Sequence, residues 1–422
     1  MADQYRLIME NNMNKRLLLP LMISASFSTQ ALGDSVVVYD ESSLQDAFQQ
    51  ASYNPDIDEI IFKRNSHISL STPAIYSGEQ SITLIGKGST IDGSSAGGFV
   101  LDSDLTAITE DGTLIFNTAG EVKIKNLKVV NSATRGIVVN VPVDASGDDV
   151  SVNLDRVSVT HSALYGLHID DNADAFDDGT TGSGLGVELK LTRCTFEFNG
   201  TGAIDFDGVR VDERGLGDIY AFISNTAIDN NGGDGIELDE AGDGNVEVYM
   251  NRVSLNDNGF YNEEDLDDGF DIDEADAGNI EAILSNLVVN NNKDEGLDFD
   301  EAGDGNIEAK FKRISAFNNN DEAIKLDEED AGNIEAKLKK VDVEESGDDG
   351  IQFTELGEGK IETLLKSVRA INNKKYGIKI EQWVVEDEAE HAEEAGSMTL
   401  KRVELAGNGK GDEIKTNNIE QN

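Results

Sequence analysis

The sequence is poor in cysteine, in basic residues and in long apolar runs. Its single cysteine, Cys194, excludes an intramolecular disulfide and any zinc or iron–sulfur site built from clustered thiolates, and we expect it to pack as a small buried residue. Its 34 Lys and Arg stand against 83 Asp and Glu, for a formal charge of −49. Such a surface repels nucleic acid and anionic lipid, so we expect neither as a partner.

Apolar residues are concentrated near the N-terminus, but only in a short run. Met13–Arg16 supplies a basic segment, and Leu17–Phe27 is an apolar stretch that is too short to span a membrane. Small residues follow at Ala31 and Gly33. We therefore expect residues 1–33 to be a leader with a secretory signal peptide, the protein to be secreted or periplasmic, and the chain to have no membrane span.

The dominant feature that is present is an acidic block that recurs at a fixed step. Its copies read GIELDEAGDGNVE, GFDIDEADAGNIE, GLDFDEAGDGNIE, AIKLDEEDAGNIE and GIQFTELGEGKIE, and they begin at Gly235, Gly269, Gly296, Ala323 and Gly350. A partial copy, GIKIEQ, begins at Gly377, so the steps are 34, 27, 27, 27 and 27 residues. A fixed period of this length predicts a solenoid, because one such repeat cannot bury its apolar face without stacking on its neighbours.

Upstream of the repeats, short apolar stretches alternate with polar turn residues. Val36–Tyr39 reads as a strand, Asp40 as the cap of a helix through Ala51, and Ser81–Gly93 (SITLIGKGSTIDG) as strand and glycine turns. Strand patterns recur from Thr113 to Ile169.

Together, the N-terminal strand and helix, the segment LIGKGSTIDG and the coils that end in Asn-rich turns resemble the right-handed parallel β-helix proteins of the pectate-lyase-like superfamily. The resemblance covers about residues 36–380. It implies an all-β fold, a single right-handed parallel β-helix solenoid with an N-terminal capping helix. We expect the β-helix at 34–380, with the acidic repeats from about 234, and an acidic insertion and C-terminal cap at 381–422.

Stacking in parallel register converts the repeat into columns of equivalent residues about 4.8 Å apart. One amide column holds Asn231, Asn292, Asn319 and Asn373, each four residues before a repeat start, with Ser346 in that place in one coil. A second holds Asn245, Asn279, Asn306 and Asn333, with Lys360 at its end. We interpret both as structural ladders of hydrogen-bonded amides.

Acidic residues form similar columns, which require a counter-charge. One comprises Asp234, Asp268, Glu295, Glu322 and Asp349; the second Asp239, Asp273, Asp300 and Asp327; the third Glu240, Glu274, Glu301, Glu328 and Glu355. Like charges about 5 Å apart repel by about 0.8 kcal/mol in water and by several times more in a protein. A Ca²⁺ ion between two carboxylate oxygens spans about 4.6–5.2 Å, which matches the coil spacing.

Acidic residues in the following turns alternate between the fifth and the fourth position of the turn, which staggers carboxylates on neighbouring coils. We therefore predict a row of calcium sites between coils. The predicted ligands are Asp239, Asp243, Asp273, Asp276, Asp300, Asp304, Asp327 and Asp330. The alternative is a solvated acidic face whose repulsion is screened by salt.

A separate calcium candidate precedes the repeats. Asp170, Asn172 and Asp174 have the D-x-N-x-D spacing of a calcium loop, but Ala175 stands where an EF-hand requires glycine and no flanking helices are predicted. We predict a β-helix loop that binds calcium, not an EF-hand.

Candidate catalytic residues lie just upstream of the acidic block. The hydrolases of the resembled superfamily carry Gly-His-Gly and Arg-Ile-Lys segments, which this sequence lacks. Arg135, His161, Tyr165 and His168 fall on adjacent predicted coils, where an Arg beside Tyr and His supplies a base and an acid for a lyase. The alternative is that these are ordinary turn residues and partly buried histidines.

Two functions follow from these patterns. The first is a secreted calcium-binding β-helix scaffold that binds a glycan or a cell surface. The second is a calcium-dependent polysaccharide lyase or related carbohydrate-active enzyme. An aromatic insertion around Phe260 and Tyr261 either binds sugar or covers its coil. The sequence leaves the oligomeric state open.

Overall fold

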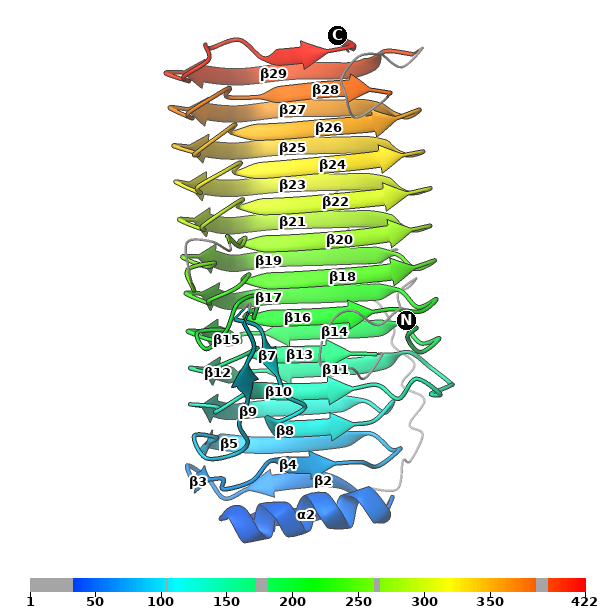
Figure 1. Ribbon diagram of the computed structural model, residues 1–422, viewed down its shortest axis with the longest axis vertical. Coiled ribbons are helices and arrows are strands. Elements are labelled where there is room, and N and C mark those ends of the chain that lie inside the picture. Colours follow the sequence, from blue (N-terminus) through cyan, green and yellow to red (C-terminus); the bar gives the residue numbers. More distant parts are fainter. Residues whose placement is uncertain (1–32, 104, 172–180, 262–265, 385–393) are drawn as a thin grey trace, which may run out of the picture. The chain divides into compact units, whose positions relative to one another are not determined.

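The computed structural model describes residues 33–422 except 104, 172–180, 262–265 and 385–393 (Figure 1). Most of the predicted leader, residues 1–32, lies outside the described residues, as do Asn172 and Asp174. Within the described residues, the structure contains no helix long and apolar enough to cross a membrane.

The helix α2 (Glu41–Tyr53) covers the first coil at the N-terminal end of the stack (Figure 1). Asp40 begins it as a capping box: its carboxylate accepts from the backbone N–H of Ser43 at 2.9 Å, and the Ser43 hydroxyl accepts from the backbone N–H of Asp40 at 3.1 Å. The helix buries Leu44 and Phe48 against the coil. The predicted cap is confirmed.

Two parallel sheets form the walls of the solenoid. In sheet B the strands are β4 (Ala74–Tyr76), β8 (Gly112–Asn117), β10 (Arg135–Asn140), β13 (Leu167–Asp170), β16 (Val209–Glu213), β18 (Ile236–Gly242), β20 (Phe270–Asp276), β22 (Leu297–Gly303), β24 (Ile324–Asp330), β26 (Ile351–Gly357), β28 (Lys379–Trp383) and β30 (Lys415–Asn417). Each pairs with its neighbour one coil away.

In sheet A the strands are β1 (Asp34–Val38), β2 (Ile57–Phe62), β3 (His67–Ser69), β5 (Ile82–Asp92), β9 (Val122–Val130), β11 (Val150–Asp155), β12 (Ser158–Thr160), β14 (Val187–Thr192), β15 (Thr195–Glu197), β17 (Ile219–Asp229), β19 (Val246–Asn256), β21 (Asn279–Asn290), β23 (Asn306–Phe317), β25 (Asn333–Glu344), β27 (Lys360–Ile371), β29 (Gly396–Ala406) and β31 (Ile419–Gln421). A small antiparallel hairpin joins β6 (Val100–Leu101) to β7 (Ala107–Ile108).

The register of these pairs follows the sequence repeat. Phe299 pairs with Ile272, 27 residues earlier, and Ala309 pairs with Ala282 at the same step. Alternate side chains of each strand point into a continuous apolar core, and Cys194 is buried within it. The protein is therefore an all-β, right-handed parallel β-helix with an N-terminal helix, as predicted. The pairing continues through β28 to β31.

A ladder of buried amides runs along the turn that follows the second strand segment of sheet A. Its members are Asn199, Asn231, Asn258, Asn292 and Asn319, then Ser346, Asn373 and Asn408. From Asn199 to Asn319, and again from Asn373 to Asn408, each Asn side chain donates from Nδ2 to Oδ1 of the next, at 2.9 Å from Asn292 to Asn319; Asn319, which precedes Ser346, donates to the carbonyl of Val289 instead. The sequence prediction omitted Asn258, because the insertion of this coil separates it from the next repeat start; the ladder position is fixed by the end of the preceding strand.

Candidate metal centre and the acidic columns

The third acidic column is buried at the corner where sheet B ends. We call it the glutamate ladder: Glu213, Glu240, Glu274, Glu301, Glu328 and Glu355, all 0–1 % exposed and paired in register. At Glu213, Glu240 and Glu355, the backbone N–H of the glycine four residues on donates to the carboxyl, at 3.2 Å from Gly244 to Glu240. That position has little room, because a Cβ on Gly305 would lie 2.3 Å from Oε1 of Glu301.

Among the described residues, neither carboxyl oxygen of Glu274, Glu301 or Glu328 has a partner for a hydrogen bond, although these side chains stack in register. Two carboxylates cannot form that bond unless one of them carries a proton. Burial accordingly raises the pKa of Glu240 and Glu274 to about 8 and that of Glu328 to about 9. The column ends on a neutral amide, since Gln382 pairs with Glu355 and is fully buried.

A further acidic column, which the sequence analysis did not consider, occupies the outward positions of sheet B two residues before the Asp239 column. Glu237, Asp271 and Asp298 stack in it in register. Arg210 stands next to Glu237 at one end and Lys325 occupies the place after Asp298 at the other. The signal was available: the copies from Gly235, Gly269 and Gly296 have acids at their third and fifth positions, and GVRVDERG from Gly208 is one more copy, 27 residues before Gly235, with Arg210 at its third position.

These two cations neutralise only the ends of the column. Arg210 pairs with Glu237, and Nζ of Lys325 lies 2.7 Å from Oδ2 of Asp298. In the part of the chain that the structure describes, Asp271 between them forms no ion pair. Arg210 and Lys325 act on Asp271 and Asp273 only from other coils, and both carboxyls keep a raised pKa.

Several carboxylates lie close together around Asp271, between Arg210 and Lys325. We call Glu237, Asp268, Asp271, Asp273 and Asp298 the acidic face. One oxygen each from Glu237, Asp271 and Asp273 lie within 4.8 Å of one another, and so do oxygens of Asp268, Asp271 and Asp298. Asp271 belongs to both groups. Asp298 is 6 % exposed, and its Oδ1 has no hydrogen-bond partner within the described residues.

The pKa values of the acidic face reflect this crowding. Burial, reinforced by Asp273 and Asp300, raises the pKa of Asp271 well above its usual range. Burial also raises the pKa of Asp273 to about 6, with the charge of Asp239 as the next contribution. A divalent cation between the coils would supply the missing positive charge.

The predicted turn ligands lie elsewhere. Asp243, Asp276, Asp304 and Asp330 are exposed. Their staggered positions have a backbone cause: Asp276 has φ 85°, and its carbonyl accepts from the N–H of Asp304 at 3.0 Å. That carbonyl would lie 1.6 Å from a Cβ on Gly303, so the neighbouring turn requires glycine there. Asp239, Asp273, Asp300 and Asp327 do stack in register on sheet B.

The first acidic column binds backbone N–H groups of the next coil. The N–H of Asp234 donates to Oδ1 of Asp207 at 2.8 Å, and that of Glu295 donates to Oδ1 of Asp268 at 2.7 Å. Upstream, Arg135 and Tyr165 occupy equivalent places before a coil-start glycine. Acid at this position therefore has a structural role at Asp207, Asp234, Asp268 and Asp349, each of which accepts from a backbone N–H of the next coil.

Among the catalytic candidates, the structure brings Arg135, Tyr165 and His168 together. Nη1 of Arg135 lies 3.0 Å from Nδ1 of His168, and Nε2 of His168 lies 2.7 Å from Oδ2 of Asp212. Because a guanidinium only donates, Nδ1 accepts and Nε2 carries the proton that it donates to Asp212. The Tyr165 ring lies 4.5 Å from the imidazole, between centroids.

This cluster is buried and continues into an ion-pair network. Arg135, His168, Asp170 and Asp212 are buried, and Arg210 Nε donates to Oδ1 of Asp212 at 2.6 Å. The hairpin of β6 and β7 packs near it, where the N–H of Ile204 donates to the carbonyl of Leu105 at 3.1 Å. Sequence reasoning missed Asp212 and Arg210, which lie in the unrecognised copy from Gly208.

His161 stands apart from this cluster. It is exposed, has φ 61°, and its ring lies 5.1 Å from that of Phe198. His161 and His168 are on opposite sides of a turn, so the four candidates do not form one site. Asp170 stacks with Asp212 in sheet B.

No family model and no curated protein matches the sequence. Among solved structures, the chain is similar to the catalytic domain of a GH87 α-1,3-glucanase in complex with tetrasaccharides, with TM-score 0.50 and 11% identity over 93% of this chain and 68% of that one. It also matches a periplasmic alginate epimerase AlgG, with TM-score 0.43 and 11% identity over 86% and 77%. The A-module of the Azotobacter vinelandii mannuronan C-5 epimerase AlgE4 follows, with TM-score 0.38 and 12% identity over 90% and 94%. The likeness to the glucanase establishes the fold.

Proposed function

We propose that the protein is a secreted calcium-binding β-helix in which Ca²⁺ bridges neighbouring coils at the acidic face. The observation that carries the proposal is the position of Asp271, which two three-carboxylate groups share and whose pKa stays raised although Arg210 and Lys325 act on it from other coils. The buried Oδ1 of Asp298, without a partner among the described residues, supports it.

The chemistry of the acidic face fits calcium. Ca²⁺ takes oxygen ligands at about 2.3–2.6 Å in flexible geometry, so oxygens up to about 5 Å apart can share one ion. Mg²⁺ requires oxygen ligands at about 2.0–2.1 Å in regular octahedral geometry, which carboxylates stacked at the coil spacing do not provide. Bound calcium would hold three successive coils together.

Calorimetric titration of the chain with CaCl₂ tests this proposal. Asp271→Asn keeps the shape of the side chain but removes its charge, and we expect it to weaken calcium binding by about 2 kcal/mol, roughly thirtyfold in Kd. Asp304→Asn, in an exposed turn one coil on, is the matched control and should leave Kd unchanged. If Asp304→Asn weakens binding as much as Asp271→Asn, the turn carboxylates are the ligands instead; no calcium binding at all refutes the proposal.

A second candidate function is a calcium-dependent polysaccharide lyase or related carbohydrate-active enzyme. It is supported by the defined tautomer of His168 between Arg135 and Asp212, and a glucanase shares the fold. Because Arg135 and His168 are buried, we favour a structural role for them. We expect no unsaturated product from alginate or pectate, with or without calcium; product that disappears in Arg135→Ala while the fold is retained would establish the enzyme.

Export rests on the leader. We propose that residues 1–33 direct the protein to the periplasm or the medium, where calcium is available to the acidic face. Fractionation of cells that express the full chain should place it outside the cytoplasm, whereas a chain without these residues should stay inside.

A further inference from the structure

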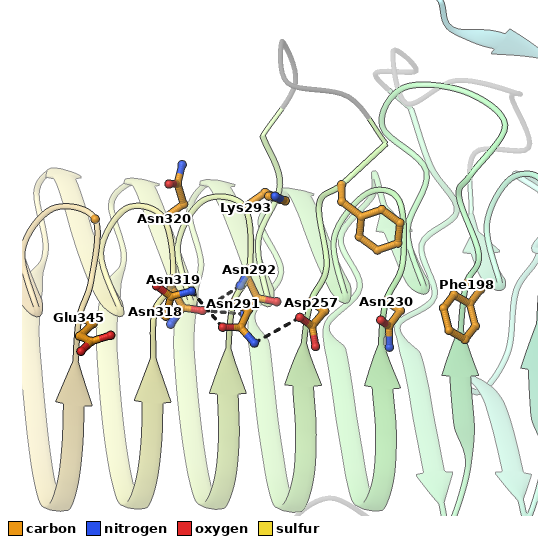
Figure 2. Close-up of a pocket in the computed structure, with 12 residues that line it drawn as sticks. Phe198, Asn230, Asp257, Asn291, Asn292, Lys293, Asn318, Asn319, Asn320 and Glu345 are labelled. Atoms are coloured by element: carbon orange, nitrogen blue, oxygen red, sulfur yellow. Dashed lines mark hydrogen bonds between the residues drawn. The ribbon is translucent and has the colours of Figure 1, made fainter.

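A groove of about 620 Å³ follows the turn of the Asn ladder (Figure 2). One side is a row of residues that each precede a ladder position and have positive φ: Phe198, Asn230, Asp257, Asn291, Asn318 and Glu345. The buried amides Asn292 and Asn319 and the turn residues Phe260, Lys293, Asn320 and Gly347 complete the lining. The row crosses six successive coils, about 24 Å at about 4.8 Å per coil.

The groove differs from the rest of the protein in charge. Its lining holds Asp257, Glu345 and Lys293, a formal charge of −2 + 1 = −1, within a chain of −49. A polyanion would still meet the negative potential of the whole chain. The lining therefore favours a neutral ligand that has many hydroxyl groups.

The amides of the row are oriented by one another and keep hydrogen-bonding capacity for a ligand. Nδ2 of Asn318 donates to Oδ1 of Asn291 at 3.0 Å, and Nδ2 of Asn291 donates to Oδ1 of Asp257 at 3.2 Å (Figure 2). Each amide nitrogen has two hydrogens, and the row uses one of them. A regular series of amide donors and acceptors at coil spacing matches a polymer with a repeated pattern of hydroxyls.

Aromatic rings lie at the same groove. Phe198 and Phe260 are 39 % and 37 % exposed, and the ring of His161 packs on Phe198. The C–H faces of a pyranose ring pack on the electron-rich face of an aromatic ring, while its edge hydroxyls reach polar groups. Rings beside a row of amides thus provide both parts of sugar recognition.

We propose that this groove binds a neutral polysaccharide, with its chain running along the row from Phe198 to Glu345. The amides of Asn230, Asn291 and Asn318 bind hydroxyls, and Phe198 and Phe260 bind ring faces. This site is separate from the acidic face and does not depend on calcium.

Calorimetric titration with soluble neutral hexasaccharides of glucose, mannose and xylose tests the proposal, with oligogalacturonate and oligomannuronate as anionic comparators. We expect at least one neutral oligosaccharide to bind, equally in EDTA and in CaCl₂, and the anionic ones to bind more weakly. Phe260→Ala should weaken binding roughly tenfold, the value of one lost aromatic contact. Asn230→Gly, which permits the positive φ, should weaken it by a smaller factor.

Phe317→Ala is the matched control, because Phe317 is exposed to 40 % on the same turn region but does not line the groove. It should leave Kd within about twofold. Unchanged circular dichroism of all variants separates a binding defect from misfolding. The proposal is overturned if no neutral oligosaccharide binds at millimolar concentration, or if Phe260→Ala and Phe317→Ala have equal effects.

Discussion

The Asn ladder and the glutamate ladder have the same coil spacing and the same burial, but opposite electrostatic consequences. Asn292 donates to Asn319 and accepts from Asn258 without outside help. Glu274 and Glu301 have the same relation in register, yet neither can donate without a proton. A stacked side chain stabilises a solenoid by itself only if it contains both a donor and an acceptor.

The acidic face extends this contrast to the outside of sheet B. There, Asp271 and Asp273 are half-buried, so a cation from solution can reach them, and we propose that calcium takes the place of the proton that the buried ladder requires. The proposed calcium sites would place metal on the face of the same coils whose interior carboxyls have raised pKa values.

The largest effect should come from a carboxylate placed in the Asn ladder. Asn292→Asp removes two N–H donors at a buried position and leaves a charge without a partner, so we expect a loss of about 3–5 kcal/mol in the free energy of unfolding. Asn320→Asp, at an exposed position of the same turn one coil on, should cost less than about 0.5 kcal/mol. Urea unfolding measures both, and equal losses would contradict the contrast between the two ladders.

Removing a charge from the acidic face should instead increase the free energy of unfolding when calcium is absent. In EDTA, Asp271→Asn relieves repulsion and should stabilise the protein by about 1 kcal/mol. In CaCl₂ it should remove the ligand-dependent stabilisation, which amounts to about 2.7 kcal/mol for one site at a hundredfold excess over Kd. Thermal melting in the two buffers checks this reversal, and an unchanged melting temperature of the parent in EDTA would count against calcium.

The smallest effect should come from Glu328→Gln, and it depends on pH. An ordinary glutamate titrates near 4.5, whereas burial raises the pKa of Glu328 to about 9. Its contribution to stability is therefore complete below the unfolded value and is lost as the pH rises through the folded value. The variant should equal the parent near pH 5 and exceed it by about 1 kcal/mol near pH 9.

The exposed neighbour provides the control for this measurement. Glu329→Gln should leave the pH dependence of the melting temperature unchanged, because Glu329 faces solvent. A parent protein that gains stability between pH 5 and pH 9 in EDTA would show that the glutamate ladder is not a proton-holding column.

The fold was predictable because a period of 27 residues permits only stacked coils, and register then places Asp239 over Asp273 and Asn245 beside Asn279. The assignment of residues to columns does not predict which carboxylates lie close enough together to share an ion. Asp271 lies two residues before Asp273 and points outward like it, but only the positions of Arg210 and Lys325 show that its nearest cations stand on other coils. Convergence depends on neighbours from other coils and turns, which spacing along one strand does not encode.

Insertions account for the other omissions. Asn258 was displaced from its expected spacing by extra residues after it, and the copy at Gly208 is hidden by the irregular coil before it. Arg135 and His168 fell near each other in the predicted coils and are in contact, yet their burial could not be read from the sequence, because it depends on Asp212 and on the hairpin of β6 and β7.

One turn position alternates between glycine and aspartate along the stack: Gly242, Asp276, Gly303, Asp330 and Gly357. Adjacent coils are therefore not interchangeable. One coil turns its carbonyl towards the next, and the next must lack a side chain to receive it. The unit of structural repetition in this region is thus a pair of coils, 54 residues from Gly303 to Gly357. Shortening or lengthening the solenoid by an even number of coils preserves this parity, whereas an odd number brings two turns of the same kind into contact.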